Sequence, residues 1–261
     1  MFVWLFGDKA LILRMTGAAF ISFTLVCLLG SRMIRFLMKA KLGDRPEFNH
    51  ADLNELARHK SNTPTMGGLL IVVAIFISVL LFADLSNKYI LMGLGALVWL
   101  GCLGGIDDWM KLKRGKDSTS RHGLLSWEKL AFQVGLAVLL AWSMWQYGAQ
   151  KPVMMGNGEE QIPAHMFYFP FKANPVALSF VVYLIVMVLT TVGSSNAVNL
   201  TDGMDGLASG CMAITCVVFL LISWIVGVSE WATFFHLPLV PGSAEMTVLC
   251  AAMLGACLGF L

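Results

Sequence analysis

Two short acidic motifs stand out in a sequence that is otherwise rich in apolar residues. Asp107 and Asp108 follow directly after an apolar run, and Asp202 and Asp205 lie three residues apart among glycines. Oxygen ligands without neighbouring Cys or His suit a hard cation, and Mg²⁺ that keeps several waters needs only one or two protein carboxylates. The motifs therefore predict a magnesium site, with Asp202 and Asp107 as metal ligands and all of these aspartates as candidate catalytic residues.

Each motif also has a purely structural explanation. Asp107 or Asp108 could pair with Lys111 at a helix end, at spacings of four and three residues. Adjacent carboxylates point about 100° apart on a helix, so we do not expect one lysine to satisfy both, and one carboxylate should stay free for a metal or a substrate. In the second motif an aspartate could cap the following helix, with Asn196 and Asn199 in a turn. Capping needs only one such residue, whereas four carboxamide and carboxylate groups lie within ten positions, which favours a functional site.

A third polar segment, residues 59–68, contains Lys60 and Thr65 before the pair Gly67-Gly68. Lys60 could be an ordinary positive charge of a cytoplasmic loop, and Thr65 could be a helix N-cap. These residues by themselves leave the structural and the substrate-binding roles open. The sequence has no Walker A loop and no Gly-x-Gly-x-x-Gly after a strand, which excludes the soluble nucleotide-binding folds that use them.

The composition indicates which elements must position these motifs. Hydrophobic residues make up 57% of the chain and charged residues 13%, against about 25% charged residues in an ordinary soluble domain. The net charge of +2 does not favour nucleic acid as a partner. The six cysteines lie in or beside apolar runs without a Cys-x-x-Cys pair, which is typical of small hydrophobic side chains. The composition predicts an all-α, polytopic integral membrane protein.

Seven apolar stretches approach the length of about 20 residues that a transmembrane helix needs. No water-soluble domain has room between them, so residues 1–261 are expected to form a single transmembrane domain. The predicted spans are Leu11–Gly30, Met66–Phe82, Tyr89–Gly105, Leu130–Tyr147, Ala177–Gly193, Leu207–Val228 and Met246–Leu261.

The distribution of Lys and Arg predicts how these spans are oriented. Both are concentrated in residues 32–60 and 111–129, and short loops rich in Lys and Arg face the cytoplasm. The first, third and fifth spans then end at the cytoplasmic face, so all three polar segments converge there. We expect residues 150–174 to lie outside and to hold a short hairpin, and Arg14 to be an interfacial anchor. Acidic residues at span ends rather than at mid-membrane argue against an ion path of a transporter or channel.

In order, side and spacing, the three segments resemble the polyprenyl-phosphate N-acetylhexosamine-1-phosphate transferases, of the glycosyltransferase family 4 type. The Asp107-Asp108 pair and the pattern Asn-x-x-Asn-x-Thr-Asp-Gly-x-Asp-Gly in residues 196–206 look like the whole superfamily. Thr-Pro-Thr-Met-Gly-Gly in residues 63–68 looks like the branch that transfers phospho-N-acetylmuramoyl-pentapeptide. That element disfavours the sister reaction, which uses UDP-GlcNAc as donor.

The resemblance implies a Mg²⁺-dependent enzyme of the bacterial inner membrane with its active site on the cytoplasmic face. It would transfer phospho-N-acetylmuramoyl-pentapeptide from UDP-MurNAc-pentapeptide to undecaprenyl phosphate, giving lipid I and UMP in the first membrane step of peptidoglycan synthesis. A homodimer is a further expectation. The substrate-binding residues that we carry over are Lys60, Thr65, Lys111, Lys129, Asn196 and Asn199.

We expect a division of roles among these residues. Asp202 would ligate the magnesium of the UDP pyrophosphate, while Asn196 and Asn199 with Lys60 would position the nucleotide or its phosphate. Asp107 or Asp108 would deprotonate or orient the lipid phosphate. Direct in-line attack and a covalent phospho-aspartate route both remain open.

The resemblance also implies ten spans in the full-length family, with a Gly-Asp-Thr-Gly-Ser element, a further catalytic Asp and a cytoplasmic His cluster. In this chain they would follow Leu261. We therefore expect the transmembrane domain to be incomplete at its C-terminus and the 261-residue chain to be inactive by itself.

Overall fold

The computed structural model describes residues 10–39, 67–114, 123–150, 153–155, 161–162, 166–167, 176–202 and 206–261. Lys60, Thr65 and Asp205 lie outside these ranges. The expectations for these three residues therefore stay predictions.

Membrane-length helices make up most of the described chain. Six of them are long and apolar enough to cross a membrane, and α4 is a shorter apolar helix. These helices confirm the prediction of an all-α, multi-pass membrane protein, with one helix for each predicted span. The helices are α2 (Leu11–Lys39), α4 (Gly67–Phe82), α5 (Lys88–Arg114), α6 (Ser126–Gln150), α7 (Phe180–Thr201), α8 (Leu207–Gly227) and α10 (Met246–Phe260).

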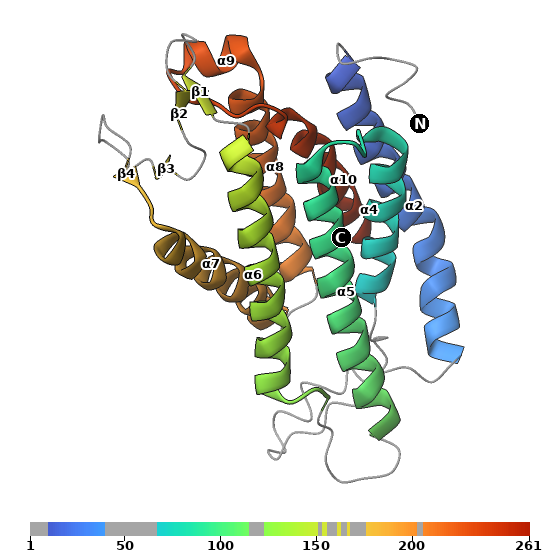
Figure 1. Cartoon of the computed structure of the whole chain (residues 1–261). Coiled ribbons are helices and arrows are strands. Elements are labelled where there is room, and N and C mark those ends of the chain that lie inside the picture. The colour runs from blue at the N-terminus through green and yellow to red at the C-terminus, as the bar shows by residue number, and fades with distance from the viewer. Residues whose placement is uncertain are drawn as a thin grey trace.

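Short elements lie beyond one end of the long helices (Figure 1). β1 (Val153–Met155) pairs in antiparallel fashion with β2 (Gln161–Ile162), which confirms the hairpin expected in residues 150–174. β1 also pairs with β5 (Pro238–Leu239), which lies between α8 and α10 in the chain. The other short elements are β3 (Met166–Phe167), antiparallel to β4 (Val176–Ala177), the helix α9 (Ser229–Phe234) and the 3-10 helix η3 (Ser243–Glu245).

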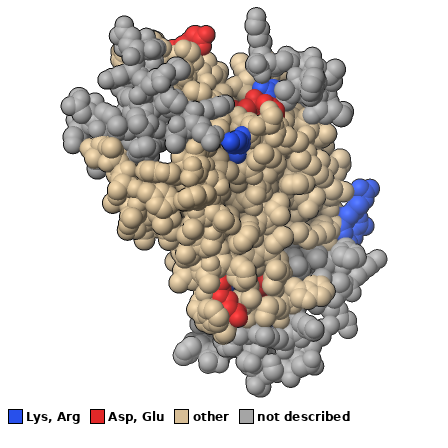
Figure 2. Space-filling model, in the orientation of Figure 1, with Lys and Arg blue, Asp and Glu red and all other residues tan. Residues whose placement is uncertain are grey.

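The arrangement of the helices brings the polar motifs toward one end. Successive long helices run in opposite directions, and the end of α5, the start of α6 and the end of α7 lie toward the lower part of Figure 1. Charged side chains are visible near the top, toward the bottom and at the right-hand edge, and the broad area among them is free of charge (Figure 2). This distribution suits lipid contact, because helices satisfy their own backbone groups and present apolar side chains outward.

The packed core lies where α10 contacts α2, α4 and α8. Ala252 and Ala256 of α10 are fully buried. At Gly255 an added Cβ would collide with the Ala19 carbonyl oxygen and the Ser22 hydroxyl of α2. Small residues thus allow two membrane helices to approach closely, which increases their van der Waals contact.

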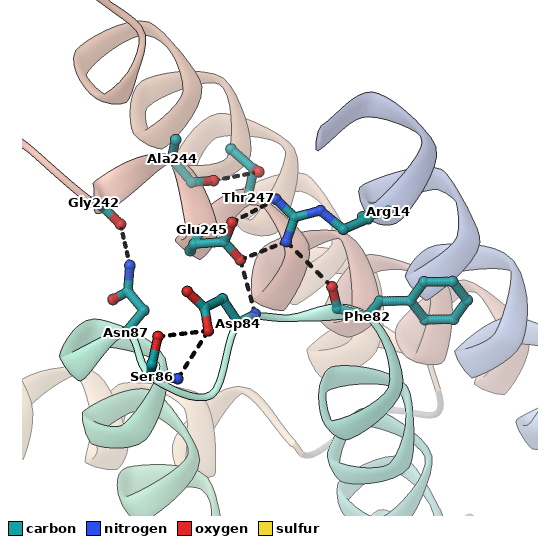
Figure 3. Close-up of polar contacts among 9 residues, drawn as sticks. All are labelled: Arg14, Phe82, Asp84, Ser86, Asn87, Gly242, Ala244, Glu245 and Thr247. Carbon is teal, nitrogen blue, oxygen red and sulfur yellow. Dashed lines mark hydrogen bonds and ion pairs between the residues drawn. The ribbon is translucent and has the colours of Figure 1, made fainter. Parts of the chain in front are cut away.

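The expectation that Arg14 is an interfacial anchor is wrong. Its side chain is only 2% exposed, and its guanidinium forms two hydrogen bonds to the carboxylate of Glu245, at 2.6 and 2.9 Å. The same carboxylate accepts a 3.0 Å hydrogen bond from the backbone N–H of Asp84, and Arg14 also donates to the Phe82 carbonyl oxygen at 3.4 Å (Figure 3). A buried charge needs a partner, and here the partner lies 231 residues away, where local sequence patterns give no indication of it.

The Glu245 carboxylate is expected to be essential for the stability of this end of the bundle. Glu245→Gln should lower the free energy of unfolding by about 3–5 kcal/mol, because it leaves the guanidinium of Arg14 buried without a counter-charge. Thermal unfolding in detergent micelles measures the change. Glu230→Gln is the matched control, because Glu230 is exposed in α9, and it should have little effect.

Replacing both partners, Arg14→Met with Glu245→Met, should recover much of the lost stability, because two apolar side chains leave no buried charge unpaired. A single Glu245→Gln variant as stable as the unchanged protein would contradict this account of the ion pair.

Candidate functional site

The first acidic motif lies inside a helix rather than after one. The predicted span ended at Gly105, but α5 continues to Arg114. The last turns of α5 therefore contain Asp107, Asp108 and Lys111. At helical spacings of four and three residues, Lys111 can contact either carboxylate. Asp107 is buried, with 8% of its surface exposed.

The carboxylate of Asp107 accepts three hydrogen bonds from two segments. Its Oδ1 accepts from the backbone N–H of Leu124 at 2.9 Å, and its Oδ2 accepts from the ammonium of Lys129 at 2.8 Å. The ammonium of Lys111, one turn further along α5, also lies 2.8 Å from Oδ2. Asp107 thus joins the end of α5 to the start of α6, and both of its oxygens are occupied by donors.

Gly123 makes the close approach to Asp107 possible. A Cβ at this position would collide with Oδ1 of Asp107 and lie 3.0 Å from its backbone oxygen. The next residues start α6: Glu128 accepts a hydrogen bond from the N–H of Leu125 at 2.8 Å, and the Leu125 carbonyl accepts from the N–H of Glu128 at 3.0 Å. Such a reciprocal arrangement stabilises a helix N-terminus. It thereby determines the position of Lys129, whose side chain binds Asp107.

Sequence reasoning missed Gly123, because an isolated glycine after a polar loop has no distinctive pattern. Its position was the one available signal: Gly123 lies three residues before α6, the helix that carries Lys129.

Asp108 is the more accessible carboxylate of the pair. Its side chain is 34% exposed, and its Oδ1 lies 3.4 Å from the ammonium of Lys111. The expectation that one lysine would not reach both carboxylates is wrong, because the long side chain of Lys111 extends back along α5 between residues three and four positions earlier. The contact to Asp108 is nevertheless the longer one, so this carboxylate keeps most of its capacity to accept hydrogen bonds or bind a cation.

The second motif is also largely helical. α7 continues to Thr201, so Asn196 and Asn199 lie in the helix and not in a turn. Asp202 is the C-cap of α7 and not the N-cap of the next helix; its backbone N–H donates to the Val198 carbonyl at 3.2 Å. The N-cap of α8 is Gly206, with φ of 79°, a conformation that glycine adopts without steric cost.

The helix brings these three polar side chains to one face. Asn196, Asn199 and Asp202 follow one another at intervals of three residues, so they fall within an arc of about 120° around α7. Ser195 lies within the same arc and contacts Gln133 of α6. The polar stripe of α7, defined by Asn196, Asn199 and Asp202, therefore runs down the side of the helix that faces α6.

Sequence reasoning also missed Gln133, which is 6% exposed about two turns after the start of α6. It exchanges hydrogen bonds with α7, accepting from Nδ2 of Asn196 at 2.9 Å and donating to Oγ of Ser195 at 3.1 Å. A signal was present in the sequence: an amide interrupts an apolar run one helical turn after Lys129.

The structure brings some of the predicted site residues together and not others. Asp107, Asp108, Lys111 and Lys129 form one cluster, which we call the aspartate–lysine cluster. Asn196 is joined to α6 through Gln133. Among the described residues no group of three or more His, Cys, Asp or Glu side chains is arranged as a metal site.

The aspartate–lysine cluster combines two carboxylates with two ammonium groups, so its formal charges cancel. A lysine ammonium group binds phosphate oxygens as well as carboxylate oxygens, and its flexible side chain allows it to move from a carboxylate to a phosphate. An arriving phosphate could therefore take up Lys111 or Lys129, both of which are partly exposed. The cluster can thus bind an anion and present a carboxylate beside it.

Comparison with known proteins gives two family matches. A model described as Glycosyl transferase family 4 matches residues 89–261, and one described as Phospho-N-acetylmuramoyl-pentapeptide-transferase signature 1 matches residues 60–72. The first range contains the aspartate–lysine cluster and the polar stripe of α7.

Two curated relatives are equally similar to this chain in sequence. The chain is 35% identical to the phospho-N-acetylmuramoyl-pentapeptide-transferase of Desulfotalea psychrophila over 249 residues, which cover 95% of this chain and 64% of that protein. It is also 35% identical to the protein of the same name from Rickettsia bellii, over 94% of this chain and 63% of that protein. The chain thus spans slightly less than two thirds of the length of these relatives.

The contact between Gly123 and Asp107 can be tested by adding a single methyl group. Gly123→Ala should push the Leu124 segment away from Asp107 and break the hydrogen bond to Oδ1, with a loss of about 1–3 kcal/mol in the free energy of unfolding. The control is Gly135→Ala in α6, where a Cβ would meet nothing within 4 Å. Thermal unfolding of both variants measures the difference, and equal stability would show that the close approach is not required.

Proposed function

The chain belongs to glycosyl transferase family 4, as its polar segments predicted, and on that basis we propose that the protein transfers phospho-N-acetylmuramoyl-pentapeptide from its UDP carrier to undecaprenyl phosphate. The products are lipid I and UMP. The match of residues 60–72 to the phospho-N-acetylmuramoyl-pentapeptide-transferase signature supports this donor over UDP-GlcNAc. The observation that carries the proposal is the aspartate–lysine cluster at the end of a membrane helix.

The position of the cluster suits a reaction between a lipid and a water-soluble nucleotide. An undecaprenyl chain lies among the lipid tails, while its phosphate lies at the level of the headgroups. Asp107 and Lys111 belong to the last turns of α5, so they would meet that phosphate at the membrane boundary. Both substrates are anionic, and Lys111 with Lys129 can offset the repulsion between their phosphates.

We assign different tasks to the two carboxylates of the pair. Asp107, held by Leu124, Lys111 and Lys129, keeps both lysines in place. Asp108 has one longer contact and a partly exposed side chain, so it is the better candidate to accept a proton from the lipid phosphate or to orient it.

The reaction step is an in-line displacement. An oxygen of the lipid phosphate attacks the phosphorus that carries the sugar, and a new P–O bond forms. The bond from that phosphorus to the bridging oxygen breaks, and UMP leaves with the bridging oxygen. Any proton on the attacking phosphate passes to Asp108.

Magnesium fits the donor set of the described residues in part. Mg²⁺ is commonly bound by one or two carboxylates together with substrate phosphates, and Asp108 and Asp202 both offer carboxylate oxygens. Asp107 could bind the metal only after releasing a lysine, and Asp108 is assigned to the lipid phosphate, so we propose Asp202 as its protein ligand. When bound, Mg²⁺ would offset charge on the pyrophosphate and on the departing UMP.

We further propose that the cluster faces the cytoplasm of a bacterium, at the inner membrane, because Lys and Arg are concentrated at that end of the spans. Residues 1–261 would form a single transmembrane transferase domain, and the protein would work as a homodimer. Asp205, Asn199, Lys60 and Thr65 remain proposed members of the site.

The first test is a turnover assay of the full-length protein in detergent with undecaprenyl phosphate. UDP-MurNAc-pentapeptide should support UMP release, and UDP-GlcNAc should not. Asp108→Asn should lower kcat by about 10²–10⁴, the usual contribution of a general base. Asp84→Asn is the control, because Asp84 lies in the turn beside Glu245 at the other end of the bundle; it should keep full activity.

Turnover of UDP-GlcNAc in place of the muramoyl donor would favour the sister reaction, and full activity of Asp108→Asn would refute the assignment of this carboxylate.

The second test concerns the metal. After removal of divalent ions with a chelator, activity should return on addition of Mg²⁺. Asp202→Asn should raise the Mg²⁺ concentration that gives half-maximal activity by about tenfold, equivalent to about 1.4 kcal/mol of binding free energy. Asp84→Asn again serves as control. An unchanged Mg²⁺ requirement in Asp202→Asn would rule out Asp202 as a ligand.

A further inference from the structure

A chain of amide contacts connects α6 to the polar stripe of α7. Asn196 Nδ2 lies 2.9 Å from the carbonyl oxygen of Val192 and 2.9 Å from Oε1 of Gln133. Nε2 of Gln133 in turn donates to Oγ of Ser195 at 3.1 Å. Gln133 is buried, whereas Asn196 is exposed.

The backbone carbonyl of Val192 determines the orientation of both side-chain amides, those of Asn196 and Gln133. A carbonyl oxygen can only accept a hydrogen bond, so the Asn196 atom facing it must be the NH₂ group. The Gln133 atom that faces this NH₂ group must then be its oxygen. Consequently the NH₂ group of Gln133 faces the hydroxyl of Ser195, which can accept.

Both N–H groups of the Asn196 amide are therefore used within the protein. One is directed to Val192 and the other to Gln133. Its Oδ1 has no hydrogen-bond donor among the described residues, and the residue is exposed. An exposed carbonyl oxygen held in this way accepts hydrogen bonds and cannot donate them.

The same face of α6 also holds the aspartate–lysine cluster. Lys129 and Gln133 are four residues apart, so they lie on one face of α6, about 6 Å apart along the axis. Lys129 binds Asp107 of α5, and Gln133 binds Asn196 of α7. A single helix face thus positions groups of both neighbouring helices.

We propose that Gln133 is a positioning residue that keeps Oδ1 of Asn196 directed at the substrate, where it accepts a hydrogen bond from a hydroxyl or N–H group of the nucleotide-sugar. This inference rests on the proposed function and deepens it. It also changes the role expected for Asn196, because a carbonyl oxygen repels a phosphate oxygen. Phosphate contacts are left to the lysines, and Asn196 recognises a donor group on the sugar, ribose or base.

The kinetic test compares Gln133→Met, which keeps the length of the side chain but can neither donate nor accept, with Gln133→Glu, which keeps an acceptor toward Asn196. Gln133→Met should raise KM for the nucleotide-sugar by about five- to tenfold with little change in kcat, the effect of losing one oriented hydrogen bond. Gln133→Glu should retain most of the affinity. Ser195→Ala, which alters only the far end of the chain of contacts, should change KM by less than about twofold.

A double-variant cycle separates positioning from a general structural role. If Gln133 acts through Asn196, then Gln133→Met should have no further effect on KM in an Asn196→Ala background. An equal effect in both backgrounds, or a fall in thermal stability of Gln133→Met that accounts for its loss of activity, would overturn the proposal.

A measurement without substrate tests the orientation itself. In protein labelled with ¹⁵N-asparagine, the side-chain NH₂ signal of Asn196, assigned by its loss in Asn196→Asp, should exchange slowly with water because both N–H groups are bonded. Gln133→Met should accelerate the exchange. Rapid exchange in the unchanged protein would refute the orientation even if the enzyme is active, whereas slow exchange in a protein without turnover would refute the proposed function alone.

Discussion

The carboxylate of Asp107 is a buried negative charge at the end of an apolar helix, and a charge in that position has to be neutralised where it lies. Lys111 and Lys129 supply the opposite charge, and the N–H of Leu124 supplies a further donor. Because these donors come from α5, from the start of α6 and from the segment before it, the arrangement of the candidate site depends on this one carboxylate. Asp108 remains accessible because Asp107 holds the lysines.

A second constrained pair lies at the other end of the bundle. Arg14 and Glu245 bind each other between α2 and the start of α10, and Glu245 also holds the turn after α4. Between the two ends, small residues of α10 pack against the backbone of α2. Buried charges thus specify the contacts at both ends, while close packing of small side chains stabilises the middle, as expected for helices without a hydrophobic driving force between them.

The helices and the outer hairpin could be predicted because their signals are local. A run of apolar residues is sufficient for a membrane span, and the predicted bounds of α4, α6, α8 and α10 were confirmed within a few residues. α2, α5 and α7 were predicted too short, since polar residues near their ends were taken as loop. The helices continue through Lys111 and Asn199 because polar side chains at a membrane boundary reach water or each other without interrupting backbone hydrogen bonds.

By itself the sequence determined the membrane class, the order of the spans, the family, and the residue types available for chemistry, because these follow from composition, periodicity and short motifs. Only the tertiary structure decided how the residues are paired: that Lys111 reaches both aspartates, that Lys129 and Gln133 connect three helices, and that Arg14 is buried against Glu245. Such pairs join residues far apart in the chain, and packing of the helices selects them. The carboxylates of the first motif were therefore visible in the sequence, but the difference between Asp107 and Asp108 was not.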